Sequence, residues 1–319
     1  MRAVFLDYQS MKPAELDFEQ LASATSEFVT YDATSPDLIA EYIAGFEVVI
    51  LNKVRFLREH FEQAKDLKLI LVAATGTDNV DKSAAVDHDV AVCNVTAYGT
   101  SSVSQHTMML MLMVATQAER YRNEVKAGIW QASPMFCLMD YPILDLSGRT
   151  LGLIGYGELG KAVGKLAEAF GMRVLVMSRD GVKYTNGPQR VSFDLLLEQS
   201  DFISLHGLLN AETEKMMNEK AFARMKPGSF LINTARGGLV DEDALCDALE
   251  SGHLGGAGLD VLTVEPPSLE SRLLACAHPN LVITPHSAWA SRESRQHIVD
   301  ILQGNLEAFF EGAPINRVA

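Results

Sequence analysis

The stretch Thr150-Leu-Gly-Leu-Ile-Gly-Tyr-Gly-Glu-Leu-Gly160 decides the fold. Residues 150–154 predict a strand and residues 161–170 predict a helix. Between them Gly155 permits a tight turn, Gly157 lets the backbone approach a pyrophosphate, and Gly160 lets the helix pack closely on the strand. A strand, a glycine-rich turn and a helix in this order predict a dinucleotide-binding unit, although a purely structural turn is the alternative.

The first turn of that helix supplies the anion site. The amides of Glu158 and Leu159 open the helix, where unpaired N–H groups and the positive end of the dipole favour a phosphate. An NAD-preferring unit usually ends its second strand with an acid. Here Ser178 and Arg179 stand at that point, and a guanidinium suits a 2′-phosphate. We expect NAD(P)(H) as cofactor with a preference for NADP(H), unless Asp180 binds the ribose.

Short apolar runs alternate with helix-permissive stretches on both sides of this turn. With 319 residues, the chain predicts two domains. The alternation predicts α/β units whose sheets are parallel, with helices on both faces. The expected strands span residues 3–6, 28–31, 48–51, 69–73, 90–93, 150–154, 173–177, 202–205, 230–233, 258–261 and 281–283.

Two helices and one irregular segment complete the prediction. A long helix is expected over residues 102–126, with a methionine-rich half that fills a core. Residues 128–147 have the composition of a linker, and their aromatic side chains are suited to pack on another domain or subunit. A last helix is expected over residues 291–310.

Composition narrows the class of function. The net charge of −14 makes nucleic acid and acidic lipid unsuitable partners. The most apolar window, residues 108–115, is too short to span a bilayer, and the first residues predict a strand rather than a signal peptide. Four cysteines without a C-x-x-C pair match no zinc site and indicate a reduced, cytoplasmic protein. No metal site is expected.

Three downstream segments each follow an expected strand. They are Asn233-Thr-Ala-Arg-Gly-Gly-Leu-Val-Asp241, Leu259-Asp-Val-Leu-Thr-Val-Glu-Pro-Pro267 and Thr284-Pro-His-Ser-Ala-Trp289. Arg236, Glu265 and His286 therefore lie on loops beyond the carboxyl ends of strands, which is where ligands bind in open α/β sheets.

Together with Thr75-Gly-Thr-Asp-Asn-Val-Asp81 and Met225-Lys-Pro-Gly228, these segments resemble the D-isomer-specific 2-hydroxyacid dehydrogenases over almost the whole chain. Residues 128–148 look most like the glycerate dehydrogenase (hydroxypyruvate reductase) branch. The resemblance implies two Rossmann-like domains: a discontinuous substrate domain of residues 1–98 plus 289–319, and a dinucleotide-binding domain of residues 99–288. It also implies a cleft whose closure expels water before hydride transfer.

The chemistry of 2-keto acid reduction explains the residue types. Arg236 can bind the substrate carboxylate and polarise the keto oxygen through two parallel donors. His286 can give a proton to the developing alkoxide and take it back in reverse. Glu265 would hold the imidazole and favour its protonated form.

The resemblance assigns further contacts. Backbone groups of Ala74, Thr75 and Gly76 would hold the substrate carboxylate, and Asp260 would face the nicotinamide amide. Further cofactor contacts are expected at His206, Thr213, Thr234, Ala235 and Ala288.

Departures from the family pattern shape the expected substrate. Val72 replaces an arginine that some relatives carry, and no regulatory domain follows residue 319, so a phosphorylated substrate is not expected. The segment after His206 lacks a common proline. We expect reduction of hydroxypyruvate and also glyoxylate. The alternatives are a D-lactate-type broad reductase and, without catalysis, a dinucleotide-sensing corepressor; formate dehydrogenase is less suitable because formate oxidation needs no proton-transferring histidine.

A homodimer is expected from the long helix and the aromatic segment. We hypothesise that Met135 or Phe136 of one subunit approaches the substrate pocket of the other, because exposed apolar residues in an irregular segment indicate an interface.

Overall fold

The computed structural model describes residues 1–178 and 187–319, so the predicted cofactor contact Arg179 and its alternative Asp180 lie outside the described residues. The chain forms two compact units, Met1–Gly99 with Ala290–Ala319, and Thr100–Trp289. The assignment of substrate and cofactor roles to these units stays a prediction. Among the described residues, no helix combines the length and the apolar character needed to cross a membrane.

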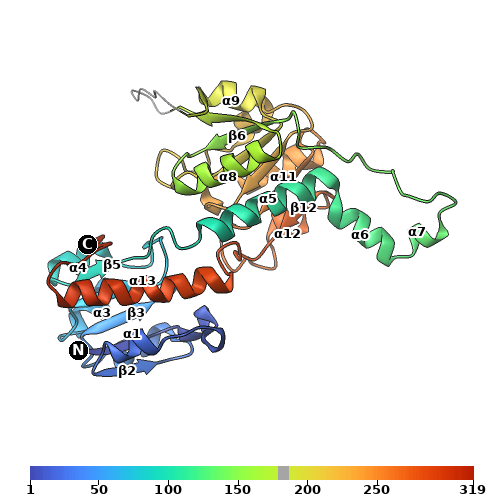
Figure 1. Ribbon diagram of the computed structural model, residues 1–319. Coiled ribbons are helices and arrows are strands. Elements are labelled where there is room, and N and C mark those ends of the chain that lie inside the picture. Colours follow the sequence, from blue (N-terminus) through green and yellow to red (C-terminus); the bar gives the residue numbers. More distant parts are fainter. Residues whose placement is uncertain (179–186) are drawn as a thin grey trace. The chain divides into compact units, whose positions relative to one another are not determined.

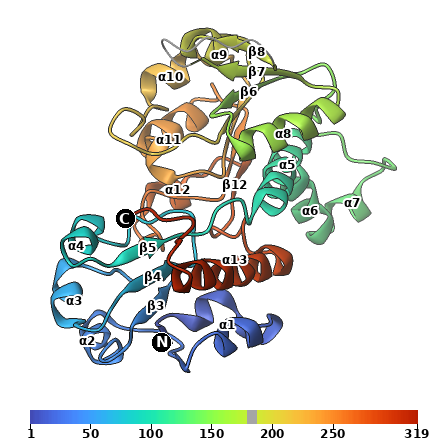
Figure 2. The ribbon, with the colours of Figure 1, turned by 60° about the vertical axis from the view of Figure 1, so that its left-hand side comes forward.

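The first unit is built on a five-stranded parallel sheet with the order β2-β1-β3-β4-β5. Strands β3 and β4 are buried throughout, as expected of central strands covered on both faces. Helix α13 packs against β4 and α1 (Figure 2). The elements are β1 Arg2–Phe5, α1 Glu19–Ser23, β2 Glu27–Thr30, α2 Ile39–Tyr42, β3 Val48–Leu51, α3 Arg58–Gln63, β4 Leu69–Val72, α4 Lys82–Asp87, β5 Ala91–Cys93 and α13 Arg292–Phe310, with 3-10 turns at Tyr8–Met11, Pro13–Glu15 and Pro36–Leu38.

The second unit holds a seven-stranded parallel sheet with the order β12-β11-β10-β9-β6-β7-β8. The predicted α/β class with parallel sheets in both units is confirmed. The elements are α5 Thr100–Thr116, α6 Ala118–Lys126, α7 Ile129–Ala132, β6 Thr150–Ile154, α8 Glu158–Ala169, β7 Arg173–Met177, β8 Gln189–Val191, α9 Phe193–Gln199, β9 Phe202–Leu205, α10 Glu219–Arg224, β10 Phe230–Asn233, a 3-10 turn at Gly237–Leu239, α11 Glu242–Glu250, β11 Gly256–Leu259, α12 Arg272–Ala275 and β12 Leu281–Ile283.

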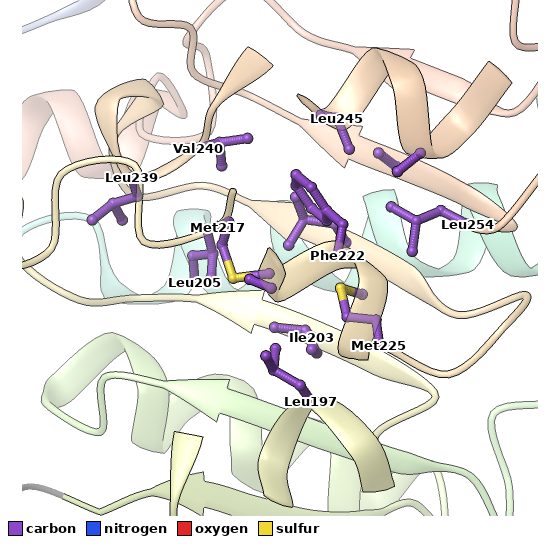
Figure 3. Close-up of a cluster of buried hydrophobic side chains, with 14 of the residues drawn as sticks. Leu197, Ile203, Leu205, Met217, Phe222, Met225, Leu239, Val240, Leu245 and Leu254 are labelled. Atoms are coloured by element: carbon purple, nitrogen blue, oxygen red, sulfur yellow. The ribbon is translucent and has the colours of Figure 1, made fainter. Parts of the chain in front are cut away.

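Two apolar cores lie on opposite faces of this sheet, because successive strand residues point to opposite sides. Phe230 and Ile232 of β10 join the core under α5, where Met111 is fully buried. Leu231 joins the other core, which packs around Phe222 of α10 (Figure 3). The methionines of α5 therefore serve as core residues, but Met109 is exposed.

The helix expected over residues 102–126 is wrong as a single element. Gln117 adopts a left-handed backbone with φ of 54° and separates α5 from α6. A single left-handed residue changes the direction of the chain, and its tertiary environment, not its helix propensity, holds it there, since Gln117 is buried. The next stretch, expected to be irregular, contains the short helix α7 and extends away from the sheet of the second unit (Figure 1).

Two strands also differ from the prediction. Strand β8 was missed, because its residues are Gln-Arg-Val and show no apolar run. The strand expected over residues 258–261 is β11, Gly256–Leu259. Its glycines disfavour a strand on propensity, but a Cβ at Gly258 would lie 2.9 Å from Cβ of Leu110. Close packing of α5 on β11 thus accounts for the composition, and the shift places Asp260 at the start of a loop.

Candidate active site

The candidate site lies along the carboxyl edge of the second unit's sheet. His286 follows β12, Glu265 follows β11, and Arg236 follows β10, and these three strands are neighbours in the sheet. Beyond β9, the next strand is β6, which leads into the glycine-rich turn. Chain connections leave β6 and β9 in opposite directions, and such a point in a parallel sheet is where ligands bind.

Glu265 and His286 form a hydrogen-bonded pair. Nδ1 of His286 lies 2.5 Å from Oε2 of Glu265, and about one third of each side chain is exposed to solvent, 31% and 34% respectively. The other carboxylate oxygen accepts the amide of Leu262 at 2.8 Å. Because both oxygens of Glu265 accept hydrogen bonds, the carboxylate fixes the orientation of the imidazole. Nε2 lies at the opposite side of the ring and, as far as the described residues go, is available for proton exchange.

The loop of Arg236 packs directly on the loop of Glu265. A Cβ at Gly237 would lie 1.9 Å from the carbonyl carbon of Leu262, so only glycine permits this approach. The side chain of Asn233 stabilises this loop through two hydrogen bonds. Its Nδ2 donates to the carbonyl of Arg236 at 2.9 Å, and its Oδ1 accepts the backbone amide of Ala235 at 3.0 Å. The sequence prediction did not assign Asn233 a role, although an asparagine that ends a buried strand is a signal of this kind.

The guanidinium of Arg236 is half-buried and donates from Nη1 to the carbonyl of Ala235 at 2.8 Å. Within residues 1–178 and 187–319 it forms no ion pair with a carboxylate. Within the same residues it makes no hydrogen bond to Glu265 or His286. Of the three predicted catalytic residues, the structure therefore pairs Glu265 with His286. A half-buried cation without a protein anion is suited to bind an anionic ligand.

The glycine-rich turn has the shape of an anion cradle. Gly155 has φ of +94°, and a Cβ there would lie 2.5 Å from the backbone of His206. A Cβ on Gly160 would lie 2.2 Å from the carbonyl oxygen of Gly155. In contrast, a Cβ on Gly157 would meet nothing within 4 Å, so open space faces the backbone where Glu158 and Leu159 begin α8. These observations fit a bound pyrophosphate.

His206 is a neutral neighbour of this cradle. Burial of its ring lowers its pKa to about 4. Its Nε2 lies 2.9 Å from the hydroxyl of Ser204, and its amide donates to the carbonyl of Ile154 at 2.7 Å. A neutral ring adds no charge to a phosphate site, so His206 supports the turn by packing and hydrogen bonding.

Several predicted cofactor contacts use their polar groups within the chain. Both the hydroxyl and the amide of Ser178 donate to the carbonyl of Val191, at 3.0 and 2.8 Å. The Thr213 hydroxyl donates to the carbonyl of Leu208 at 2.7 Å. The buried hydroxyl of Thr234 lies 2.9 Å from that of Thr107 on α5.

Asp260 and Ala288 are tied to each other. The Asp260 side chain is buried, and its Oδ2 accepts the amide of Ala288 at 2.9 Å, while the carbonyl of Ala288 accepts the hydroxyl of Ser102 at 2.6 Å. The expected contact of Asp260 with a nicotinamide amide stays a prediction. Its hydrogen bonds within the chain show a second role, which is to hold the segment that carries His286.

The remaining predicted residues lie in the first unit, in the turn after β4. The carbonyl of Thr75 accepts the side-chain amide of Asn94 at 2.7 Å, and its hydroxyl donates to the carbonyl of Val95 at 2.8 Å. Ala74 is buried, and its carbonyl accepts the amide of Val95 at 3.3 Å. The loop around Thr75 and Gly76 is thus fixed from one side, which leaves its main chain suited to contact a ligand.

The arrangement supports proton transfer beside an anion-binding surface. The second unit offers a carboxylate-held imidazole, a cation that pairs with no carboxylate of the described residues, and a phosphate cradle along one sheet edge. The described part of the chain contains no cluster of three or more His, Cys, Asp or Glu side chains able to hold a metal ion.

Comparison with known proteins gives a consistent result. Residues 108–288 match the family model described as D-isomer specific 2-hydroxyacid dehydrogenase, NAD binding domain. A glycerate dehydrogenase from Methylorubrum extorquens is 43% identical over 99% of this chain and 98% of its own length. A hydroxypyruvate reductase from Blautia hydrogenotrophica is 38% identical over 100% and 99%. The crystal structure of the TT0316 protein from Thermus thermophilus is 33% identical, with a TM-score of 0.85 and full coverage of both chains.

Gly157, which faces open space, and Gly160, which packs against the Gly155 carbonyl, give a matched test of the cradle. We expect Gly157→Ala to keep the stability of the fold but to weaken NADH and NADPH binding about tenfold or more, because its methyl group would occupy the space for the phosphates. Gly160→Ala should instead lower the free energy of unfolding by about 1–3 kcal/mol, because its methyl group meets the Gly155 carbonyl. Fluorescence titration and urea unfolding measure the two effects. Unchanged dinucleotide binding in Gly157→Ala would contradict the cradle.

Proposed function

Because the chain belongs to the D-isomer-specific 2-hydroxyacid dehydrogenase family, we propose that it reduces hydroxypyruvate to D-glycerate and also accepts glyoxylate. The chain is an oxidoreductase with a nicotinamide dinucleotide as cofactor. Support for the substrate comes from the names of relatives that span the whole chain, glycerate dehydrogenase and hydroxypyruvate reductase, and from Val72, which leaves no arginine there for a substrate phosphate.

The family resemblance and the hydrogen bonds of the site support the following proposed roles. The bound dinucleotide supplies or accepts the hydride. Arg236 binds the substrate carboxylate and polarises the keto oxygen, helped by the amides of Thr75 and Gly76. His286 donates its Nε2 proton to the developing alkoxide, and Glu265 stabilises the imidazole through Nδ1.

The contact between Glu265 and His286 is the observation that carries this proposal. A carboxylate held at 2.5 Å from Nδ1, with its second oxygen also anchored, is what a proton-transferring histidine needs and a dinucleotide-sensing corepressor does not. It also separates the proposal from formate oxidation, which releases no alkoxide to protonate.

The cofactor preference is a finer proposal. Ser178 at the end of β7 presents no carboxylate that would repel a 2′-phosphate, and Arg179 follows it in the sequence. We therefore propose a preference for NADP(H) over NAD(H). A cytoplasmic location is proposed as well, supported by four free cysteines.

A homodimer is proposed on the evidence of the arm, residues 118–145. Its base is closed by two tyrosines, because the hydroxyl of Tyr121 donates to the carbonyl of Tyr141 at 2.8 Å and accepts its amide at 3.0 Å. At the tip Phe136 is 86% exposed and Met139 is 76% exposed. A tethered arm with an uncovered apolar tip fits a second copy of the chain as its partner. The approach of Met135 or Phe136 to the partner's substrate pocket remains a hypothesis.

Substitutions separate the roles of the cation and the acid. Arg236→Ala should lower kcat/KM for hydroxypyruvate about 100-fold or more, because the carboxylate loses its bidentate partner. His286→Ala should lower mainly kcat, by about 100-fold or more, because proton transfer is lost. Absorbance at 340 nm with hydroxypyruvate, glyoxylate and pyruvate measures both. The exposed His88 provides a control, since His88→Ala should leave kcat within about twofold.

The same assay decides among the alternatives. A kcat/KM for hydroxypyruvate about tenfold above that for pyruvate supports the proposal. Comparable values would favour the D-lactate-type reductase, and dinucleotide binding without any turnover would favour the sensor. Full activity of Arg236→Ala or His286→Ala would refute the role of that residue.

Ser178→Asp tests the cofactor preference. The new carboxylate should repel a 2′-phosphate and accept ribose hydroxyls, so the ratio of kcat/KM for NADPH to that for NADH should fall about tenfold or more. The uncharged variant Ser178→Ala is the matched control and should leave the ratio nearly unchanged. Steady-state kinetics with both cofactors gives the ratio, and a wild-type preference for NADH would contradict the proposal.

Light scattering tests the arm. In size-exclusion chromatography with light scattering, the 34.9-kDa chain should have twice that mass. The double variant Phe136→Ser, Met139→Ser should have the mass of a monomer, because it lacks the apolar tip of the arm. Leu269, fully exposed outside the arm, offers a control, because Leu269→Ser should leave the dimer intact. A monomeric wild-type protein at micromolar concentration would exclude the dimer.

A further inference from the structure

His286 has an unusual backbone conformation. Its φ is +51°, in the left-handed region that non-glycine residues seldom occupy. Such a conformation persists only where neighbouring contacts determine it. The amide of His286 donates to the carbonyl of Asp260 at 2.8 Å and lies 3.0 Å from the carbonyl of Thr284. The direction in which the imidazole leaves the chain therefore depends on what holds residues 284–288.

The buried carboxylate of Asp260 holds that segment. It is 2% exposed, and a charge so buried needs several donors to offset its lost hydration. Its Oδ1 accepts the amide of Ser287 at 2.9 Å and the hydroxyl of Thr284 at 2.5 Å, and its Oδ2 accepts the amide of Ala288 at 2.9 Å. All three of these donors thus come from residues 284–288, the segment that carries His286.

Counting protons adds His106 to this network. The single hydroxyl proton of Thr284 goes to the carboxylate, which can only accept. Nε2 of His106 lies 2.9 Å from the Thr284 oxygen and 3.4 Å from Oδ1 of Asp260. The oxygen must therefore accept, and Nε2 must carry a proton. Burial lowers the pKa of His106, although the nearby Asp260 opposes the shift. The hydrogen-bond geometry is what assigns a proton to Nε2.

Helix α5 gives this network a rigid base. His106 lies on α5, whose Met111 and Leu110 are buried in the core beneath β10 and β12. Ser102, one turn earlier on the same helix, donates to the carbonyl of Ala288 at 2.6 Å. One helix thus contacts both ends of the segment, Thr284 through His106 and Ala288 through Ser102.

We propose that His106 is a positioning residue for proton transfer: it donates through the Thr284 hydroxyl to the Asp260 carboxylate, which sets the backbone at Ser287 and Ala288 and so aims His286 at Glu265. The inference rests on the proposed function for its effect on catalysis. Hydrogen bonds in a connected chain polarise and strengthen one another. Loss of the first donor should therefore loosen the amides at the far end as well as Thr284.

The experiment compares His106→Leu with His106→Gln, whose side-chain amide can replace the Nε2 donor. In His106→Leu the amides of Ser287 and Ala288 should exchange with deuterium about tenfold faster. Its kcat should fall about tenfold, while KM for the dinucleotide stays within about twofold. His106→Gln should restore most of both. Residue-resolved hydrogen exchange and steady-state kinetics on the full chain measure these effects.

A second pair tests the chain of donors and covers the case in which His106→Leu does not fold. Thr284→Val removes the hydroxyl and should reproduce both effects, whereas Thr284→Ser retains it and should resemble the wild type. The double variant of His106→Leu and Thr284→Val should be no worse than the more affected single variant, because either change breaks the same chain.

His253 provides a matched control for loss of a half-buried histidine. It precedes β11, at the opposite edge of the sheet, and its Nε2 lies 2.9 Å from the carbonyl of Phe222. His253→Leu should lower the melting temperature without changing exchange at Ser287 and Ala288.

The outcomes separate this inference from the proposed function. Unchanged exchange at Ser287 and Ala288 in both His106→Leu and Thr284→Val would overturn the positioning role. So would additive losses in the double variant. Faster exchange in a protein whose wild type reduces none of the three keto acids would instead uphold the network and refute the proposed activity.

Discussion

A charged carboxylate buried at the end of β11 has to be satisfied, and the candidate site is organised around that requirement. The Asp260 side chain is 2% exposed and draws donors from Thr284, Ser287 and Ala288. Meeting its hydrogen-bonding demand orders the loop after β12. The left-handed turn at His286 and the approach of its ring to Glu265 are consequences of that order. Stability and chemistry here depend on the same contacts.

The parallel sheet explains why distant parts of the chain share one edge. Residues 236, 265 and 286 follow three neighbouring strands, and the carboxyl ends of parallel strands lie on the same side. Close approach between these loops then depends on small residues, as at Gly237 against Leu262. The same edge continues to the glycine-rich turn. One architectural rule thus places an acid–base pair and an anion cradle along a single surface of one unit.

The sequence predicted those parts of the molecule whose signal is local. The turn from Gly155 to Gly160, the strands around it and the pairing of Glu265 with His286 follow from short motifs. Features that depend on contacts between distant parts of the chain were not predicted. Gln117 breaks a helix although its propensity permits one, the polar strand β8 has no apolar pattern, and His106 meets Thr284 from 178 residues away. Such contacts leave no periodic or compositional trace.

The reciprocal hydrogen bonds between Tyr121 and Tyr141 close the arm at its root. These hydrogen bonds fix the distance between the points where the chain enters and leaves the arm. The length of the segment between them can therefore change without moving either point, and a longer segment costs little additional entropy. The tip can therefore gain, lose or exchange residues during evolution without disturbing the sheet. Changes confined to the residues between these two tyrosines would give the protein new assembly partners, while the acid–base pair and the anion cradle of the same unit are inherited unchanged.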